Sequence, residues 1–197
     1  MIRATYNSNG DITGHYDDSI HAVIPEGAIE ITEAEWIASC NGNLWIDCVT
    51  MEKVIRPDRP TPKHIWKDRE WIPDRQAIAA TKLADLAAYR WGKEVGGLTL
   101  ANGMKIATDD RSKGLIAGSR VDTMTDSAIL TDWKSDSGWI KIDADTVAII
   151  STAVAAHVRG CFSVERTHAE TIAAMSADPT KTADDIAAYD ITTGWPQ

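Results

Sequence analysis

The sequence has little of several residues whose patterns would assign it to a class of protein. It contains one Phe and three Cys in 197 residues, and its 20 basic residues are outnumbered by 29 acidic ones, for a net charge of -9. Nucleic-acid binding relies on clustered Lys and Arg against phosphates, whereas the basic residues here are scattered. The charge therefore argues against a nucleic-acid partner.

Long apolar runs and targeting signals are also missing. No apolar run of about 18 residues is visible, and the start, Met-Ile-Arg-Ala-Thr-Tyr-Asn, does not resemble a signal peptide. We therefore expect no membrane partner, and a protein that stays in the cytoplasm where it is made or joins a particle assembled there. The cysteines, Cys40, Cys48 and Cys161, match no zinc spacing, so we expect buried free thiols.

Residues 1–56 carry the signals of a small, mostly β module. Two short alternating runs, 2–6 and 12–16, flank a turn rich in Asn and Gly and predict a hairpin. Thr32 and Glu35 stand three apart before a short helical segment, which is the spacing of a capping box.

A second pair of strands is predicted at residues 44–49 and 53–55. Prolines at positions 57, 60 and 62 then block regular structure and keep the chain extended. We therefore place a linker at 57–73, which ends in a small hairpin.

Residues 74–197 predict a mainly helical domain built as helix, hairpin, helix and long helix, so the whole chain is expected to be α+β. Asp74 is a good N-cap for an alanine-rich helix that a Gly-Gly pair ends. A hairpin is predicted at 98–108, because Asn102 and Gly103 can adopt the left-handed conformations of a type I′ turn.

Two further helices follow this hairpin. Thr108 or Asp109 would cap the first of them, and Asp143 or Asp145 would cap the longest, from about residue 146 to residue 177. The apolar residues of the longest helix recur at helical spacing and form one stripe, which suits packing against the alanine-rich helix.

Tryptophan is unusually frequent, with eight residues against a single Phe. Trp66 and Trp71 flank the centre of the hairpin at 64–73, and Trp133 and Trp139 flank a polar turn. Such pairs can anchor a protein partner or stack on a sugar ring, or they can cover a small core from the ends of hairpins. We name these four as candidate partner-binding residues, and we predict no catalytic, cofactor or metal site.

Two other groupings have simpler explanations. His157 and Cys161 share a helix face, the minimum for an activated thiolate, but both also fall along the packed stripe. The aspartates at 109–110 and 143–145 could bind a cation. They lack the calcium-loop pattern, and they stand where helices start, so capping is the favoured interpretation.

The stretch from about residue 75 onward resembles an uncharacterised domain found near the ends of many tailed-bacteriophage proteins encoded beside tail-fibre genes. The features that carry this resemblance are an alanine-rich helix ending in Arg90-Trp91, the Leu98-Thr-Leu-Ala-Asn-Gly-Met-Lys-Ile-Ala-Thr-Asp hairpin leading to Asp110-Arg-Ser, and Trp133 to Trp139 with the long helix after it. The N-terminal Tyr6-Asn-Ser-Asn-Gly-Asp-Ile-Thr-Gly hairpin is similar to the openings of phage tail-fibre accessory and assembly proteins.

This resemblance implies a non-enzymatic tail protein that contacts a tail fibre or baseplate protein. It would act as a structural component of the virion or as a fibre-assembly factor in the host cytoplasm. A homo-oligomer, in particular a trimer, would match the symmetry of a fibre partner. The alternative is a tail module that binds or cleaves glycans through its Trp pairs, although cleavage would need two positioned carboxylates.

Overall fold

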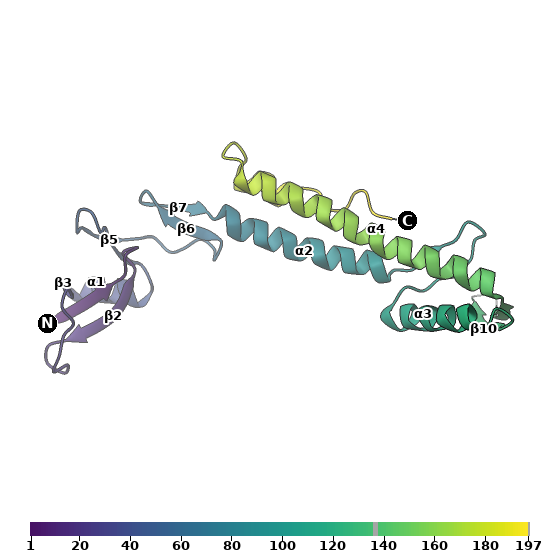
Figure 1. Cartoon of the computed structure of the whole chain (residues 1–197). Helices are drawn as coiled ribbons and strands as arrows, with labels where there is room; N and C mark the ends of the chain where they lie inside the picture. The colour runs from purple at the N-terminus through teal and green to yellow at the C-terminus, as the bar shows by residue number, and fades with distance from the viewer. Residues whose placement is uncertain (136–137, 197) are drawn as a thin grey trace. The chain divides into compact units, whose positions relative to one another are not determined.

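The computed structural model describes residues 1–135 and 138–196 (Figure 1). Its contacts divide the chain into two units, Met1–Pro73 and Asp74–Gln197. The first is mostly β and the second mostly helical, which confirms the expected α+β class. The hairpin that we placed in a linker belongs to the first unit.

The first unit is built from short strands and a short helix. They are β1 (Ile2–Tyr6), β2 (Ile12–Asp17), β3 (Ile29–Ile31), α1 (Glu33–Cys40), β4 (Leu44–Ile46), β5 (Lys53–Ile55), β6 (His64–Lys67) and β7 (Glu70–Pro73). β1 pairs antiparallel with β2 and β3, and β4 pairs with β5. Thr32 and Glu35 form the predicted capping box of α1.

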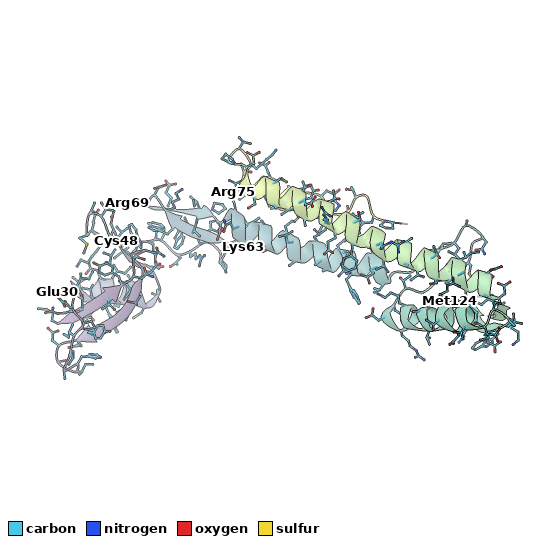
Figure 2. The ribbon with its side chains drawn as sticks, in the orientation of Figure 1. Glu30, Cys48, Lys63, Arg69, Arg75 and Met124 are labelled. Carbon is cyan, nitrogen blue, oxygen red and sulfur yellow. The ribbon has the colours of Figure 1, made fainter. Side chains whose placement is uncertain are left out.

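The β6–β7 hairpin has the turn type that we predicted for another position. Its two-residue loop, Asp68 and Arg69, has positive φ at both residues, 51° and 65°, as a type I′ turn requires. Arg69 donates to Asp47 and Glu52 of the loop between β4 and β5, which also carries Cys48 (Figure 2). Arg69 thus combines these ion pairs with a backbone conformation that glycine or asparagine usually occupies.

The second unit contains the longer helices. Its elements are α2 (Arg75–Val95), β8 (Leu98–Thr99), β9 (Lys105–Ile106), α3 (Asp110–Thr125), β10 (Thr131–Ser135), β11 (Gly138–Ile142), α4 (Ala144–Ala177) and α5 (Ala183–Ala188). Asp74 caps α2, Asp109 caps α3 and Asp143 caps α4, in agreement with the sequence.

α2 and α4 lie side by side and antiparallel (Figure 1). At one end of the pair, the Arg75 side chain donates to the carbonyl oxygens of Met175 and Asp178, so it satisfies the C-terminus of α4 (Figure 2). α3 packs on the first part of α4, where Ile116 meets Val147 and Ile150 in an apolar cluster.

The chain returns along this helix pair after α4 ends. Ile186, Ile191 and Trp195 are buried in a second apolar cluster with residues of α2 and α4. Gly160 of α4 makes room for this return, because a Cβ there would lie 2.8 Å from Cγ of Pro196. Ile191 and Trp195, beyond the last helix, are thus part of the core.

By length and composition, α4 is also apolar enough to cross a membrane, so our search of the sequence for a long apolar run overlooked this helix. Its buried stripe, which includes Val147, Val154 and Ile172, is already occupied by α2, α3 and the returning chain. A single helix of this kind is weak evidence for a membrane span, because core helices pass the same test of length and hydropathy.

The predicted type I′ turn at Asn102 and Gly103 is wrong. Leu100 N donates to Met104 O and Gly103 N donates to Leu100 O, each at 2.8 Å, which leaves a three-residue loop. Gly103 has φ +83°, whereas Asn102 keeps a negative φ, the arrangement of a turn closed by a glycine bulge. The side chains of Leu100 and Met104 pack on the core, and this packing favours the longer loop.

We expect Ile186→Ala to lower the free energy of unfolding of the second unit by about 3 kcal/mol, because it leaves a cavity in a packed cluster. Ile186 is 0% exposed. Urea unfolding followed by circular dichroism measures the change. Ile149→Ala is the control, since Ile149 is 61% exposed on α4, and equal effects of the two substitutions would contradict the assigned core.

Candidate partner-binding groove

The second unit contains an open groove of about 970 Å³ between the β8–β9 hairpin, α3 and β10. Ile106 and Ile116, both buried, form its floor. The other lining residues come from the end of α2 and from the surrounding walls: Gly96, Gly97, Leu98, Thr99, Lys105, Ala107, Arg111, Ser112, Leu115, Ser119, Thr131, Asp132, Trp133, Lys134 and Trp139.

One buried hydroxyl fixes the end of the groove where α2 stops. Thr108 is fully buried, and its Oγ1 donates to the carbonyl oxygen of Glu94 at 2.6 Å while accepting from Gly97 N at 2.9 Å. Gly97 has φ +86°, a conformation that reverses the chain after the helix. A single side chain therefore satisfies backbone groups at the turn out of α2.

A buried carboxylate joins the helices around the same end. Glu94 is 4% exposed, and its carboxylate accepts from Arg90 of α2 and, at 2.6 Å, from Nζ of Lys113 of α3. Arg90 also pairs with Glu165 of α4 at 3.1 Å. The hydrogen bond from Lys113 to Glu94, with a second one to Asp110, raises the pKa of Lys113 above its usual value.

The first turn of α3 forms part of the groove wall, and Asp109 caps it. Its carboxylate accepts from the hydroxyl of Ser112 at 2.6 Å and from the backbone N of the same residue at 3.0 Å. These bonds favour the charged form and lower the pKa of Asp109. Asp143 caps α4 in the same way through Thr146, which also lowers its pKa. Both aspartates are therefore engaged as caps.

The walls of the groove combine apolar and basic side chains. Leu115 is 63% exposed and Trp139 is 72% exposed, although both are large and apolar. Arg111 and Lys134 add positive charge. Exposed apolar side chains beside a hollow are typical of binding surfaces, because water hydrates them poorly.

Trp133 and Trp139 both line this groove, but they do not form a stacked pair. Trp133 is opposite Ile140 in the β10–β11 register, and Trp139 is opposite Lys134, so the two rings belong to different faces of the hairpin. Trp133 packs on the core beside Ile142, whereas Trp139 is open to solvent. The predicted turn between them includes residues 136–137, which lie outside the described residues.

Trp66 and Trp71 do form a pair, but other side chains of the protein cover their rings. They are directly opposite in the β6–β7 register, with ring centroids 5.2 Å apart in an edge-to-face arrangement. The guanidinium of Arg56 lies 5.8 Å from one ring and 5.3 Å from the other, and Arg59 lies 5.7 Å from Trp71. These contacts hold the β6–β7 hairpin against the rest of the first unit. They also cover ring surface that a sugar would need for stacking.

His157 and Cys161 approach each other but do not form an activated thiolate. Sγ of Cys161 lies 3.8 Å from Nε2 of His157, and that nitrogen is 3.1 Å from the carbonyl oxygen of Lys93, to which it can only donate. Burial raises the pKa of the Cys161 thiol. Both residues are thus packed side chains of α4, as the alternative interpretation held. Cys161 is a buried free thiol as expected, whereas Cys40 and Cys48 are exposed, so the expectation of burial is wrong for those two.

His168 is among the buried polar residues that the sequence did not signal, as are Glu94 and Arg56. His168 of α4 contacts the hydroxyl of Tyr189 at 2.8 Å and the carbonyl oxygen of Thr193 at 3.0 Å, and it stacks on Trp195. Its partners are all in the returning chain, so only its place on the buried stripe could have signalled its role. Among residues 1–135 and 138–196, no group of three or more His, Cys, Asp or Glu is placed to bind a metal.

Comparison with protein families finds a match. A family model described as "Domain of unknown function (DUF4376)" matches residues 58–193. The chain belongs to this family. The DUF4376 segment includes the β6–β7 hairpin and contains the whole groove. No curated protein and no solved structure matches the chain.

We expect Glu94→Gln to reduce the free energy of unfolding by about 2 to 3 kcal/mol, since it removes the charge that compensates two partly buried cations. Glu170→Gln is the matched control, because Glu170 forms an exposed pair with Arg166 on α4. Chemical denaturation of both variants tests this expectation. If the two substitutions have equally small effects, Glu94 does not join the helices in the way described.

Proposed function

We propose that this DUF4376 protein is a non-enzymatic bacteriophage tail protein that binds a tail fibre or baseplate protein. The groove of the second unit is its binding surface. It serves as a structural component of the virion or as a fibre-assembly factor, in the tail or in the host cytoplasm during assembly.

The observation that supports this proposal most directly is the exposed apolar surface at the groove. Leu115 and Trp139 are open to solvent beside a hollow with an apolar floor. Elsewhere on α3, Val121 and Met124 are 63% and 70% exposed. Burying such side chains against a partner is favourable by about 25 cal/mol for each Å² of apolar surface. The resemblance of this segment to domains encoded beside tail-fibre genes supplies the kind of partner.

The glycan alternative has less support. Arg56 covers Trp66 and Trp71, and Trp133 packs on the core, so Trp139 is the exposed ring of the four. A single ring provides one stacking surface, whereas a sugar site also needs polar groups that converge on the hydroxyls.

A phage that encodes this chain allows a direct test. We expect the chain to co-purify with a fibre or baseplate protein from infected cells, and Leu115→Glu to abolish this, because it places a charge in the apolar contact. Mass spectrometry of purified particles separates the two roles, since a structural component is present in them and an assembly factor is not.

The control for this experiment is Val49→Glu, since Val49 is 92% exposed in the first unit, far along the chain from the groove. Retention of the complex by Leu115→Glu would count against the groove as the binding surface. Failure to recover the chain with any tail protein, in lysate or in particles, would refute the tail assignment.

A trimer of this chain would have the same symmetry as a trimeric fibre partner. We therefore expect light scattering of the purified protein to give a mass of about three chains, as for closed cyclic assemblies. A monomeric mass at high protein concentration would rule out the trimer and leave the binding role in place.

A further inference from the structure

One side of the groove is the edge of a strand. β10 pairs with β11, and in the part of the chain that the structure describes no other strand pairs with it. Residues 131–134 of β10 all line the groove, whereas β11 contributes Trp139. Since successive side chains of a strand point to opposite faces, a hollow lined by consecutive residues runs along the strand's edge.

Such an edge offers backbone N–H and C=O groups to a further strand. Proteins usually protect exposed edges, because any extended segment can pair with them. Here the edge faces a groove with an apolar floor formed by Ile106 and Ile116. An added strand would therefore gain both backbone hydrogen bonds and burial of alternate side chains.

The charge at the groove specifies which segment fits. Arg111 is exposed on α3, and no carboxylate among the described residues forms an ion pair with it. Nζ of Lys134 lies 6.0 Å from the ring centroid of Trp139. The acidic side chain of Asp132 is already paired with Lys141 at 3.2 Å. In a chain with a net charge of -9, this local excess of positive charge favours an anionic segment.

We propose that the groove binds an extended acidic segment of the partner protein, which adds as a strand to the free edge of β10. Alternate apolar side chains of this segment lie on the floor of the groove beside Leu115. Its carboxylates lie toward Arg111 and Lys134. The proposal rests on the proposed function and names the chemistry of the partner at that site.

A second copy of this chain fits the edge less well. Antiparallel pairing of two β10 strands around a two-fold axis would bring together two copies of the same groove, each with Arg111 and Lys134 in its lining. A second basic groove does not supply the carboxylates that this surface favours. The charge distribution thus favours a different, acidic chain.

Binding of synthetic peptides to the full chain tests the proposal. The probe is a fluorescent peptide of about eight residues, long enough for one strand, in which Glu and Val alternate. We expect fluorescence anisotropy to show binding of this peptide that weakens as salt is added, and no binding of a control peptide in which Lys replaces Glu. Equal binding of both peptides, or of neither, would overturn the proposal.

Charge reversal locates the site. We expect the double variant Arg111→Glu with Lys134→Glu to weaken binding of the Glu peptide by about tenfold or more. Arg159→Glu is the matched control, because Arg159 is exposed on α4 and does not line the groove. An unchanged thermal midpoint in both variants verifies the fold, and equal binding by both variants would place the peptide elsewhere.

Backbone methylation of the probe tests strand addition without changing the protein. Only alternate N–H groups of an added strand point toward the neighbouring strand. Of two peptides, N-methylated at odd or at even positions, we expect one to bind and the other to lose binding. Retention of binding by both, or loss by both, would exclude pairing with β10.

These outcomes are distinguishable from failure of the proposed function. If neither peptide binds while Leu115→Glu still abolishes the natural complex, the groove binds its partner in another way and the function stands. If the Glu peptide binds as expected while Leu115→Glu leaves the natural complex intact, the groove chemistry stands and the assigned role is wrong.

Discussion

The second unit depends on a carboxylate held out of water. Glu94 lies in the last turn of α2 and accepts from Arg90 on its own helix and from Lys113 on α3. Arg90 also pairs with Glu165 on α4. Burying an ionised group is costly unless it is paired, so these cations fix where the three helices meet. Because the backbone carbonyl of Glu94 also accepts from Thr108, the same residue positions the turn from which the groove begins.

Local signals in the sequence predicted the elements well. The caps Thr32, Asp74, Asp109 and Asp143 each involve residues two or three positions apart, and the structure has all of them. The turn types were less predictable, since a turn must also suit the packing on both sides of it. Asn102 and Gly103 are a strong turn signal, but core contacts of the flanking residues selected a three-residue loop.

Contacts between distant residues could not be predicted from spacing. From the spacing of the α4 stripe, either Cys161 or Phe162 could be the buried residue. The packing shows that Cys161 is buried, whereas Phe162 lies against Arg90. No sequence pattern links Arg56 to Trp66 and Trp71. Its position over both rings therefore could not be predicted. The groove, likewise, is formed by five elements, β8, β9, α3, β10 and β11, and by the end of α2, whose proximity only the fold establishes. Its residues carry no motif.

The return of the chain along α2 and α4 determines when the second unit can fold. Domains are completed as units during synthesis, and this one lacks Ile186, Ile191 and Trp195 until the last stretch has been made. Until then, part of the apolar stripe of α4 is uncovered. His168 also lacks its hydrogen-bond partners, the Tyr189 hydroxyl and the Thr193 carbonyl oxygen. The core of this unit therefore closes only after residues 186–195 have left the ribosome. A product that stops before residue 183 would expose this stripe and be open to proteolysis.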